Sequence, residues 1–483
     1  MKHVRSVAVA SALALTMTAS ALPAAVAEPV SGEVVEYTGT IDGADFRALV
    51  PDDWNGTLVL FAHGYFPTQF AQLGFEVPDQ LANNPRTEEW LTSQGYALAG
   101  SMFGDDGFGY TLPDAVDHQE NVLDWFADEI GEPDTTLANG QSFGGGIAAL
   151  HAEQDPRVDG LLGTSAGFDP VGGWDAALDV QYAAMTLLFD DLVDENGNPV
   201  EIVNPTDPEA SQAALTGAAY EALGEPEAFD PEANARMALA GSLVQVPAWF
   251  DFASPRPEDP LEAAHALSEW VVNAYLNGHG PADRAHIAET FGGNPSTNAG
   301  VDYHALFHRS AERRTVEAAY EAAGLGKDRL RADLDALDAG TRHDADPVAR
   351  ARMAAHTASG DLDVPILTVH ATGDGGAPAA DIRSYTDHVR AEGGDIRNLW
   401  VARGGHPTVT AAEEIVAVQA LERRVRTGTW PPLNPRATGR SAAALPPETQ
   451  VVATWDESFE TIFVDTDAEF TRYVPPRAPR ATY

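Results

Sequence analysis

The clearest indication of the fold is Gly140-Gln141-Ser142-Phe143-Gly144. It follows a strand-like run, residues 135–139, and precedes a run of small and apolar residues, 147–151, that is typical of a helix. The pattern Gly-x-Ser-x-Gly at a strand-to-helix turn predicts a nucleophile elbow, in which both glycines leave room where strand and helix nearly touch. Such a turn lifts the Ser142 hydroxyl above the sheet, and the N–H groups that open the helix can hold a developing oxyanion.

The same pattern occurs a second time, as Gly163-Thr164-Ser165-Ala166-Gly167. This copy also follows a strand-like run, 158–163, but residues 168–173 predict a loop rather than a helix. Because the elbow requires the helix, we expect Ser142 and not Ser165 to be the nucleophile.

The chain of 483 residues has room for one large catalytic domain with an insertion. Residues 1–27 predict a secretory signal peptide: Lys2 and Arg5 are basic, 7–19 is mostly apolar, and Ala25-Val26-Ala27 is a cleavage site. No later stretch is long and apolar enough to cross a membrane. The sequence therefore predicts a secreted protein.

The composition excludes certain kinds of chemistry and certain classes of partner. There is no cysteine, which rules out disulfides and a cysteine nucleophile. The formal net charge is -44, and loss of Lys2 and Arg5 with the signal peptide makes it -46. We therefore expect no nucleic-acid partner and no anionic membrane surface, and we interpret the acidic residues as a solvated shell. Nothing in the sequence indicates an oligomeric state.

The order of the predicted elements favours an α/β fold with a mostly parallel sheet and helices on both faces. Asp42-Gly43 predicts a hairpin turn, and 58–62 and 96–100 are apolar runs typical of buried strands. An amphipathic helix is predicted over 113–130. Further strands at 364–370 and 399–401 and a helix at 410–423 repeat the pattern late in the chain.

These elements divide the chain into parts. The sheet and its helices are predicted in 28–173 and 361–428. Between them, 174–360 has alanine-rich helical runs, 310–323 among them, that predict a helical insertion, either a cap over the sheet or a separate domain. Residues 429–483 are predicted to be a Pro-rich linker and a C-terminal extension that ends in a loose tail, 475–483.

A nucleophilic serine needs a base within hydrogen-bond reach, and the base needs an acid to orient it. Asp374 follows the strand 364–370, and His406 follows the strand at 399–401. Both therefore lie at the edge of the sheet where Ser142 is expected, which is where open α/β sheets hold their sites. We predict a Ser142, Asp374, His406 triad. Asp395, eleven residues before His406, is the competing acid.

Two backbone N–H groups are expected to form an oxyanion hole. One belongs to Phe143, the residue after the nucleophile, and the other to Tyr65, which follows a strand in Ala62-His63-Gly64-Tyr65. His63 precedes the serine, where this arrangement uses no base, so we interpret it as structural.

With these motifs the chain resembles the α/β-hydrolase superfamily over about 45–175 and 361–425. The run 408–430 and the residues after it, to Pro432, are similar to secreted actinobacterial members, and the helical insertion corresponds to a cap. The resemblance implies a serine hydrolase rather than a dehalogenase or an epoxide hydrolase, which use aspartate at the elbow. The His-Gly-Gly-Gly loop of lipases is replaced by His-Gly-Tyr.

No metal site is predicted. The acidic loop 190–198 lacks the spacing of an EF-hand and is far more typical of a turn, although it leaves a calcium site conceivable. His304 and His308 are four residues apart without a zinc-binding motif around them. The predicted triad calls for no cofactor.

The favoured function is hydrolysis of a carboxylic ester, with a small-molecule or oligomeric ester as substrate. The apolar run 243–252 would suit an acyl group, whereas an aminopeptidase needs carboxylates such as Asp251 and Glu258 to hold an ammonium group. An exopeptidase with the same triad is the alternative. A non-catalytic binding protein on the same scaffold is disfavoured by the complete triad.

Overall fold

The computed structural model describes residues 33–483 except 73, 105–106, 225–228 and 457. The predicted signal peptide, 1–27, lies outside the described residues. Among the helices of the described part, none is both long enough and apolar enough to span a bilayer.

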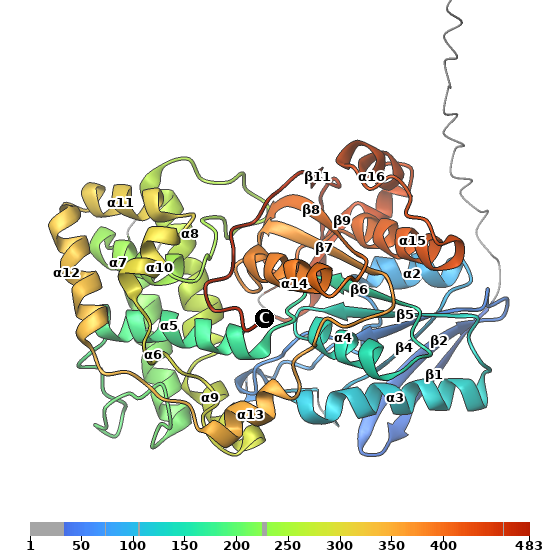
Figure 1. Cartoon of the computed structure of the whole chain (residues 1–483), viewed down its shortest axis with the longest axis horizontal. Helices are drawn as coiled ribbons and strands as arrows, with labels where there is room; N and C mark the ends of the chain where they lie inside the picture. The colour runs from blue at the N-terminus through green and yellow to red at the C-terminus, as the bar shows by residue number, and fades with distance from the viewer. Residues whose placement is uncertain (1–32, 73, 105–106, 225–228, 457) are drawn as a thin grey trace, which may run out of the picture.

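A nine-stranded sheet forms the centre of one half of the molecule (Figure 1). Six neighbouring strands are parallel, and antiparallel strands lie at both edges. The strands are, in spatial order, β1 (Val34–Ile41), β2 (Ala44–Pro51), β4 (Ala97–Ser101), β3 (Thr57–Ala62), β5 (Thr135–Gln141), β6 (Gly160–Thr164), β7 (Ile366–Gly373), β8 (Ile396–Gly404) and β11 (Phe470–Thr471). The predicted hairpin at Asp42-Gly43 is confirmed: both residues have positive φ, and they join β1 to β2.

Helices cover both faces of the sheet, as the apolar strand runs predict. One face packs against α3 (Leu112–Glu129), α4 (Gly144–Gln154) and α14 (Ala379–Ala391). The other packs against α2 (Pro85–Ser93) and α15 (Ala411–Thr427). Every residue of β3 is buried, because a parallel strand covered on both faces has no solvent side.

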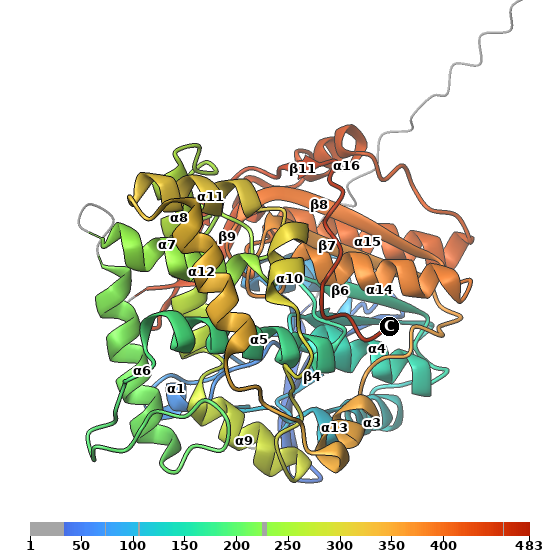
Figure 2. The same ribbon diagram turned by 60° about the vertical axis from the view of Figure 1, so that its left-hand side comes forward.

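Between β6 and β7 the chain leaves the sheet and builds a helical body beside it (Figures 1 and 2). We call this segment the inserted helices, and it has a hydrophobic core of its own. Its members are α5 (Pro170–Leu188), α6 (Pro208–Leu223), α7 (Pro231–Ser242), α8 (Pro260–Trp270), the π-helical turn η1 (Val271–Asn277), α9 (Pro281–Phe291), α10 (Tyr303–Arg309), α11 (Arg313–Ala322), α12 (Gly326–Ala339) and α13 (Pro347–Ala354).

Asp-Pro pairs determine where many of these helices begin. In each of α5, α6, α7, α8 and α13, proline is the first helical residue and the preceding aspartate accepts a hydrogen bond from a backbone N–H of the first turn. Proline has no N–H to leave unpaired there, and the carboxylate satisfies a free donor beside the positive helix end. Because Asp169 caps α5 at Pro170, the loop predicted for 168–173 is wrong beyond Asp169. The helical run predicted for 310–323 is confirmed as α11, which begins three residues later than predicted because 310–312 lie between α10 and α11.

The C-terminal region is more ordered than a Pro-rich linker and a loose tail. It contains α16 (Pro435–Ala442), a 3-10 turn η2 (Pro447–Thr449) and a hairpin of β9 (Val451–Trp455) and β10 (Thr461–Asp465). The tail is fixed because Arg480 binds Asp175 and Asp179 of α5, and the Tyr483 hydroxyl donates to the Phe168 carbonyl. This order could have been predicted only by knowing the acidic partners of Arg480, which are distant from it in the sequence.

Candidate active site

Ser142 occupies the turn between β5 and α4, and close packing of the backbone determines this turn. Its φ of +52° is in the left-handed region that L-residues rarely adopt. The Ser142 N–H donates to the Thr164 carbonyl at 3.0 Å, and the Ser142 carbonyl accepts from Gly167 at 2.8 Å. A Cβ on Gly144 would lie 2.0 Å from the Ala62 carbonyl oxygen, and one on Gly140 would lie 2.2 Å from the Gly144 carbonyl oxygen. Both glycines of the motif are therefore required, because any side chain at these positions would clash with the neighbouring backbone.

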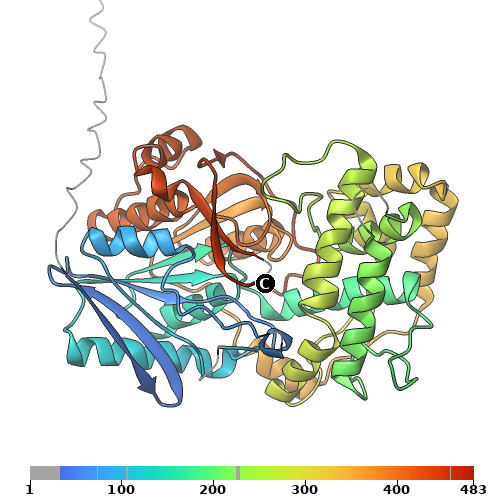
Figure 3. The ribbon, with the colours of Figure 1, turned by 180° about the vertical axis from the view of Figure 1, so that it is seen from behind.

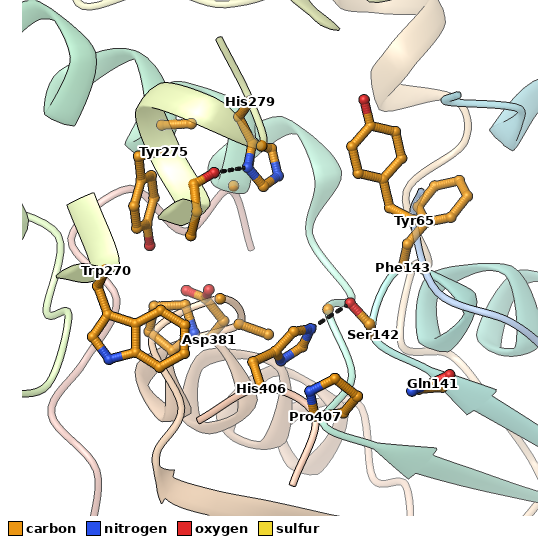
Figure 4. A pocket seen from close by; sticks show the side chains of 18 of the residues that line it. Tyr65, Gln141, Ser142, Phe143, Trp270, Tyr275, His279, Asp381, His406 and Pro407 are labelled. Atoms are coloured by element: carbon orange, nitrogen blue, oxygen red, sulfur yellow. Dashed lines mark hydrogen bonds between the residues drawn. The ribbon is translucent and has the colours of Figure 1, made fainter. Parts of the chain in front are cut away.

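Ser142, His406 and Asp374 form a continuous hydrogen-bonded series. Ser142 Oγ lies 2.8 Å from His406 Nε2 (Figure 4), and His406 Nδ1 lies 2.8 Å from Asp374 Oδ2. Asp374 is fully buried and its other oxygen accepts the N–H of Ala377 at 2.9 Å, which orients the carboxylate. The three side chains come from the C-terminal ends of β5, β7 and β8. The structure thus brings together the residues predicted from sequence.

The competing residues lie elsewhere. Ser165 has the same unusual backbone, with φ of +47°, but it is fully buried, and within the described residues its hydroxyl has no hydrogen-bond partner. Asp395 binds Arg424 at 2.9 Å and the indole of Trp430, and thus has partners of its own. His63 is buried between the carbonyls of Gly64 and Met102, and burial lowers its pKa.

The loop after β3 lies against the serine. A Cβ on Gly64 would be 3.3 Å from Ser142 Cβ, so the backbone leading to Tyr65 lies beside the hydroxyl. In the described part of the chain, neither the Tyr65 N–H nor the Phe143 N–H is taken up by a protein acceptor. The Tyr65 hydroxyl donates to Asp283 of α9, so an inserted helix holds this loop. Burial raises the pKa of Asp283 to about 7.

Ser142 and His406 open into a cavity of about 830 Å³ between the sheet and the inserted helices. Tyr65 and Phe143 lie on one side of the serine in Figure 4, and Trp270, Tyr275 and His279 line the opposite part of the cavity. Burial lowers the pKa of His279 to about 4, which keeps its ring neutral. The volume is in the range of small-molecule sites.

The apolar run expected at the site contributes only some of its residues. Val244, Phe250, Asp251 and Phe252 line the cavity, while Val246 is fully buried, and Glu258 is not among the lining residues described. Trp249 instead packs against the backbone of Gly373 and Gly404 beside the site. Sequence reasoning missed Trp270, Tyr275 and His279 because a helical insertion carries no local signal for what it faces.

Two further carboxyl groups face the cavity. Burial, and then the charges of Asp169 and Asp374, raise the pKa of Asp381 to about 7. Burial, and then the charge of Asp251, raises the pKa of Glu269 to about 7. Both groups are thus substantially protonated at neutral pH.

Asp194 and His304, two of the residues considered for metal binding, are hydrogen-bonded within the protein. In the loop 190–198, the Asp194 carboxylate accepts the N–H groups of Asn196 and Asn198 at 2.8 Å, which confirms the predicted turn. His304 binds Asp335 at 2.9 Å. Across the described residues, no group of three or more possible ligands forms a metal site.

The strand order, the strand–turn–helix around Ser142 and helices on both faces define an α/β-hydrolase fold. No family model matches the chain. The chain is 26% identical over 413 residues to an o-phthalyl amidase of Xanthobacter agilis, covering 82% of this chain and 88% of the relative.

Similar solved structures include two enzymes with very low sequence identity. The feruloyl esterase B of Aspergillus oryzae is 12% identical, with 94% of this chain and 92% of that chain covered and a TM-score of 0.40. The acylaminoacyl peptidase of Pyrococcus horikoshii is 8% identical, with a TM-score of 0.34. That match covers 78% of this chain, but it spans only 38% of the peptidase.

Proposed function

We propose that this protein is a serine hydrolase that cleaves a carboxylic ester through an acyl-enzyme on Ser142. The observation that carries the proposal is the hydrogen-bonded series from Ser142 Oγ through His406 to Asp374 at the wall of a ligand-sized cavity. A serine hydroxyl is a weak nucleophile by itself, and a base at 2.8 Å that is oriented by a buried carboxylate activates it.

Each residue has a separate role in the proposed reaction. Ser142 Oγ attacks the ester carbonyl carbon while His406 Nε2 takes its proton, and Asp374 stabilises the resulting imidazolium. The N–H groups of Tyr65 and Phe143 hold the oxyanion. Collapse of the intermediate breaks the C–O bond, and His406 gives its proton to the departing alcohol. Water then attacks the acyl-enzyme with His406 as base, which releases the acid and restores Ser142.

The lining of the cavity supports a neutral, apolar acyl group. Aromatic side chains lie on both sides of Ser142. Among the described residues that line the cavity, Arg480 is the only lysine or arginine. Arg480 already binds Asp175 and Asp179, so it holds no spare charge for a substrate anion. Such a surface binds apolar groups by removing them from water.

A substrate ammonium, which the exopeptidase alternative requires, fits less well. Of the four carboxyl groups that line the cavity, Asp169 and Asp251 already accept backbone N–H groups, and the other two, Asp381 and Glu269, have pKa values raised to about 7. Their neutral forms attract a cation only weakly. Hydrolysis of an amide other than a peptide is a second candidate, because the similar Xanthobacter protein is named as an amidase.

The test is the hydrolysis of matched substrates by the purified protein and its Ser142→Ala variant. A p-nitrophenyl ester and a p-nitroanilide with the same acyl group differ only in the bond that is broken. We expect the ester to be cleaved faster and Ser142→Ala to abolish both activities. Faster cleavage of the anilide would favour the amidase, and faster cleavage of aminoacyl-anilides the exopeptidase. Activity that survives Ser142→Ala would contradict the proposal.

We also propose that the inserted helices act as a cap over the site and that the protein is secreted after cleavage at Ala27. The cap is supported by the lining residues that come from η1 and α8. Secretion is supported by the basic and apolar segments of residues 1–27. The excess of acidic residues agrees with a partner that is a small or oligomeric ester rather than a nucleic acid or an anionic membrane.

A further inference from the structure

The hairpin of β9 and β10 exposes large apolar side chains beside the cavity. Trp455 is 38% exposed, and Phe459 and Phe463 are each 39% exposed. In Figure 3 the C-terminal red segment crosses the molecule toward the inserted helices. A cluster of exposed aromatic residues on an otherwise acidic surface indicates a binding function.

The hairpin is continuous with the cavity. Ala453, Thr454, Trp455 and Thr461 all line it, and Phe70 lines it from the short helix α1 (Gln69–Gln72) that follows β3. Thr461 is the cross-strand partner of Trp455, so the two side chains lie on the same face of the hairpin. An apolar path therefore leads outward from the cavity that contains Ser142.

Aromatic rings of the facing loop complete this path. The Trp455 ring lies 5.5 Å from that of Phe75 and 6.2 Å from that of Phe66, and the Phe459 ring lies 5.3 Å from that of Phe75. Phe66 and Phe75 are buried, whereas the two hairpin rings that rest on them remain partly in water. We call Phe70, Phe75, Trp455 and Phe459 the aromatic rim.

The tip of the hairpin holds Phe459 in an unfavourable conformation. Its φ is +62°, in the left-handed region that suits glycine, and its ring is exposed as well. The turn is fixed by Asp456, whose carboxylate accepts the N–H groups of Ser458 and Glu460. A strained residue that also exposes an aromatic ring is not explained by stability and therefore points to function.

We propose that the aromatic rim is a subsite for an apolar chain of the substrate, which extends from the scissile ester at Ser142 out of the cavity. The proposal rests on the proposed function and specifies its substrate class: esters with a long aliphatic or aromatic chain. The occupant is the substrate because the rim and the cavity share Trp455 and Phe70. An anionic lipid surface is disfavoured by the net charge of -44.

The experiment compares chain-length preference in matched variants. Phe459→Gly removes the ring and suits the positive φ, so the hairpin turn is retained. Trp455→Thr removes the second ring and replaces it with a β-branched side chain, which also favours a strand. Val348→Ser is the control, because Val348 is 59% exposed and lies outside the cavity lining.

The readout is the ratio of kcat/KM for a long ester to that for a short one. One series lengthens the acyl group and compares p-nitrophenyl octanoate with p-nitrophenyl acetate. The other lengthens the alcohol and compares octyl acetate with ethyl acetate. The two series together test whether the acyl or the alcohol side of the ester reaches the rim. We expect Trp455→Thr combined with Phe459→Gly to lower the ratio about tenfold in at least one series, because a few buried methylenes account for such a factor. Val348→Ser should not change it.

Unchanged ratios in both series would overturn the subsite. The subsite would also be overturned if the double variant lost binding to neutral phosphatidylcholine vesicles while both ratios stayed unchanged. The rim would then bind a lipid surface and not the substrate chain. The Ser142→Ala variant separates this failure from that of the proposed function. If Ser142→Ala still hydrolyses the esters, the proposed nucleophile is wrong, whereas an inactive Ser142→Ala with unchanged ratios overturns only the rim.

Discussion

Two serines in this chain have the same sequence pattern and the same backbone conformation, and their surroundings distinguish them. Ser142 has φ of +52° and Ser165 has φ of +47°. His406 approaches only Ser142, while Ser165 is sealed beneath the surface. The motif therefore predicts a turn in both places, and the chemistry depends on which turn faces the histidine.

Asp374 should determine the orientation and the charge of His406. In Asp374→Asn the amide cannot stabilise the imidazolium, and we expect kcat to fall severely, by up to about 10⁴-fold, the loss that the equivalent change causes in a serine protease. Asp395→Asn is the control, because Asp395 binds Arg424 and Trp430 instead. Steady-state ester hydrolysis measures both variants. Loss of activity in Asp395→Asn with activity kept in Asp374→Asn would reverse the assignment.

Asp283 should make stability depend on pH. Its side chain is fully buried, and burial raises its folded-state pKa to about 7 from an ordinary value of 3.8. The unfolded state therefore ionises first, so this group destabilises the fold progressively as pH rises from about 4 to 7, with no further change above that. Asp283→Asn removes the ionisation and keeps an acceptor for Tyr65.

The free energy of unfolding of Asp283→Asn, relative to that of wild type, should rise by about 3 kcal/mol from pH 5 to pH 8. The reason is that two pH units of this range lie below the folded-state pKa of Asp283, and each unit accounts for about 1.4 kcal/mol. Urea unfolding at both pH values measures this difference. A constant difference across the range would mean that Asp283 is ionised in the folded protein.

At the scale of elements, the elbow depends on glycine at two positions where strand, turn and helix touch. A Cβ on Gly144 would lie 2.0 Å from the Ala62 carbonyl oxygen, which belongs to β3 and cannot move aside freely. Gly144→Ala should therefore displace α4 from the sheet and cause loss of soluble protein or of several kcal/mol of stability, as overpacking does.

The matched control is Gly217→Ala in α6, where an added Cβ meets nothing within 4 Å. Alanine is the better helix former, so this variant should gain about 0.5–1 kcal/mol. Thermal unfolding compares the two variants. A Gly144→Ala protein as stable and active as wild type would show that the close approach is not a requirement.

The parallel sheet and its covering helices could be predicted from sequence because their signals are local. Apolar runs such as 58–62 identify buried strands, and the glycines around Ser142 identify the elbow. The order of Ser142, Asp374 and His406 at strand ends also predicted which side chains meet. Periodicity and turn chemistry are sufficient for such features.

The remainder depended on contacts between distant residues. The start of α5 at Pro170 could have been predicted from sequence, because Asp169 is a typical N-cap and Pro170 is a typical first helical residue. Tyr275 and Trp270 at the cavity, and the hairpin ending in Trp455, could not be predicted. Their positions depend on how the inserted helices and the C-terminal region pack against the sheet.

At the scale of the whole molecule, the C-terminal tail joins the two halves. Arg480 lines the cavity and binds Asp175 at 3.1 Å and Asp179 at 2.7 Å, while Tyr483 reaches back to Phe168 beside the sheet. The chain end that the sequence predicts to be loose therefore contributes to both the fold and the site.

Arg480→Ala should leave the fully buried Asp179 without its countercharge, since Tyr303 donates only a neutral hydrogen bond to it. Breaking a buried ion pair by removing one partner costs about 3–5 kcal/mol. Arg477→Ala is the control in the same tail: Arg477 is 76% exposed and lies 3.6 Å from Asp387. That surface pair is worth about 1 kcal/mol or less. Equal stabilities of the two variants in urea would mean that the tail does not hold the halves together.

Whether Ser142 is an activated nucleophile can be tested by locating a covalent adduct. A fluorophosphonate reacts with a serine hydroxyl only when a base activates it, and mass spectrometry of the digested protein identifies the modified residue. We predict one phosphonate, on the peptide that contains Ser142, lost in Ser142→Ala and retained in Ser165→Ala. An adduct on Ser165, or labelling that persists in Ser142→Ala, would show that Ser142 is not the nucleophile.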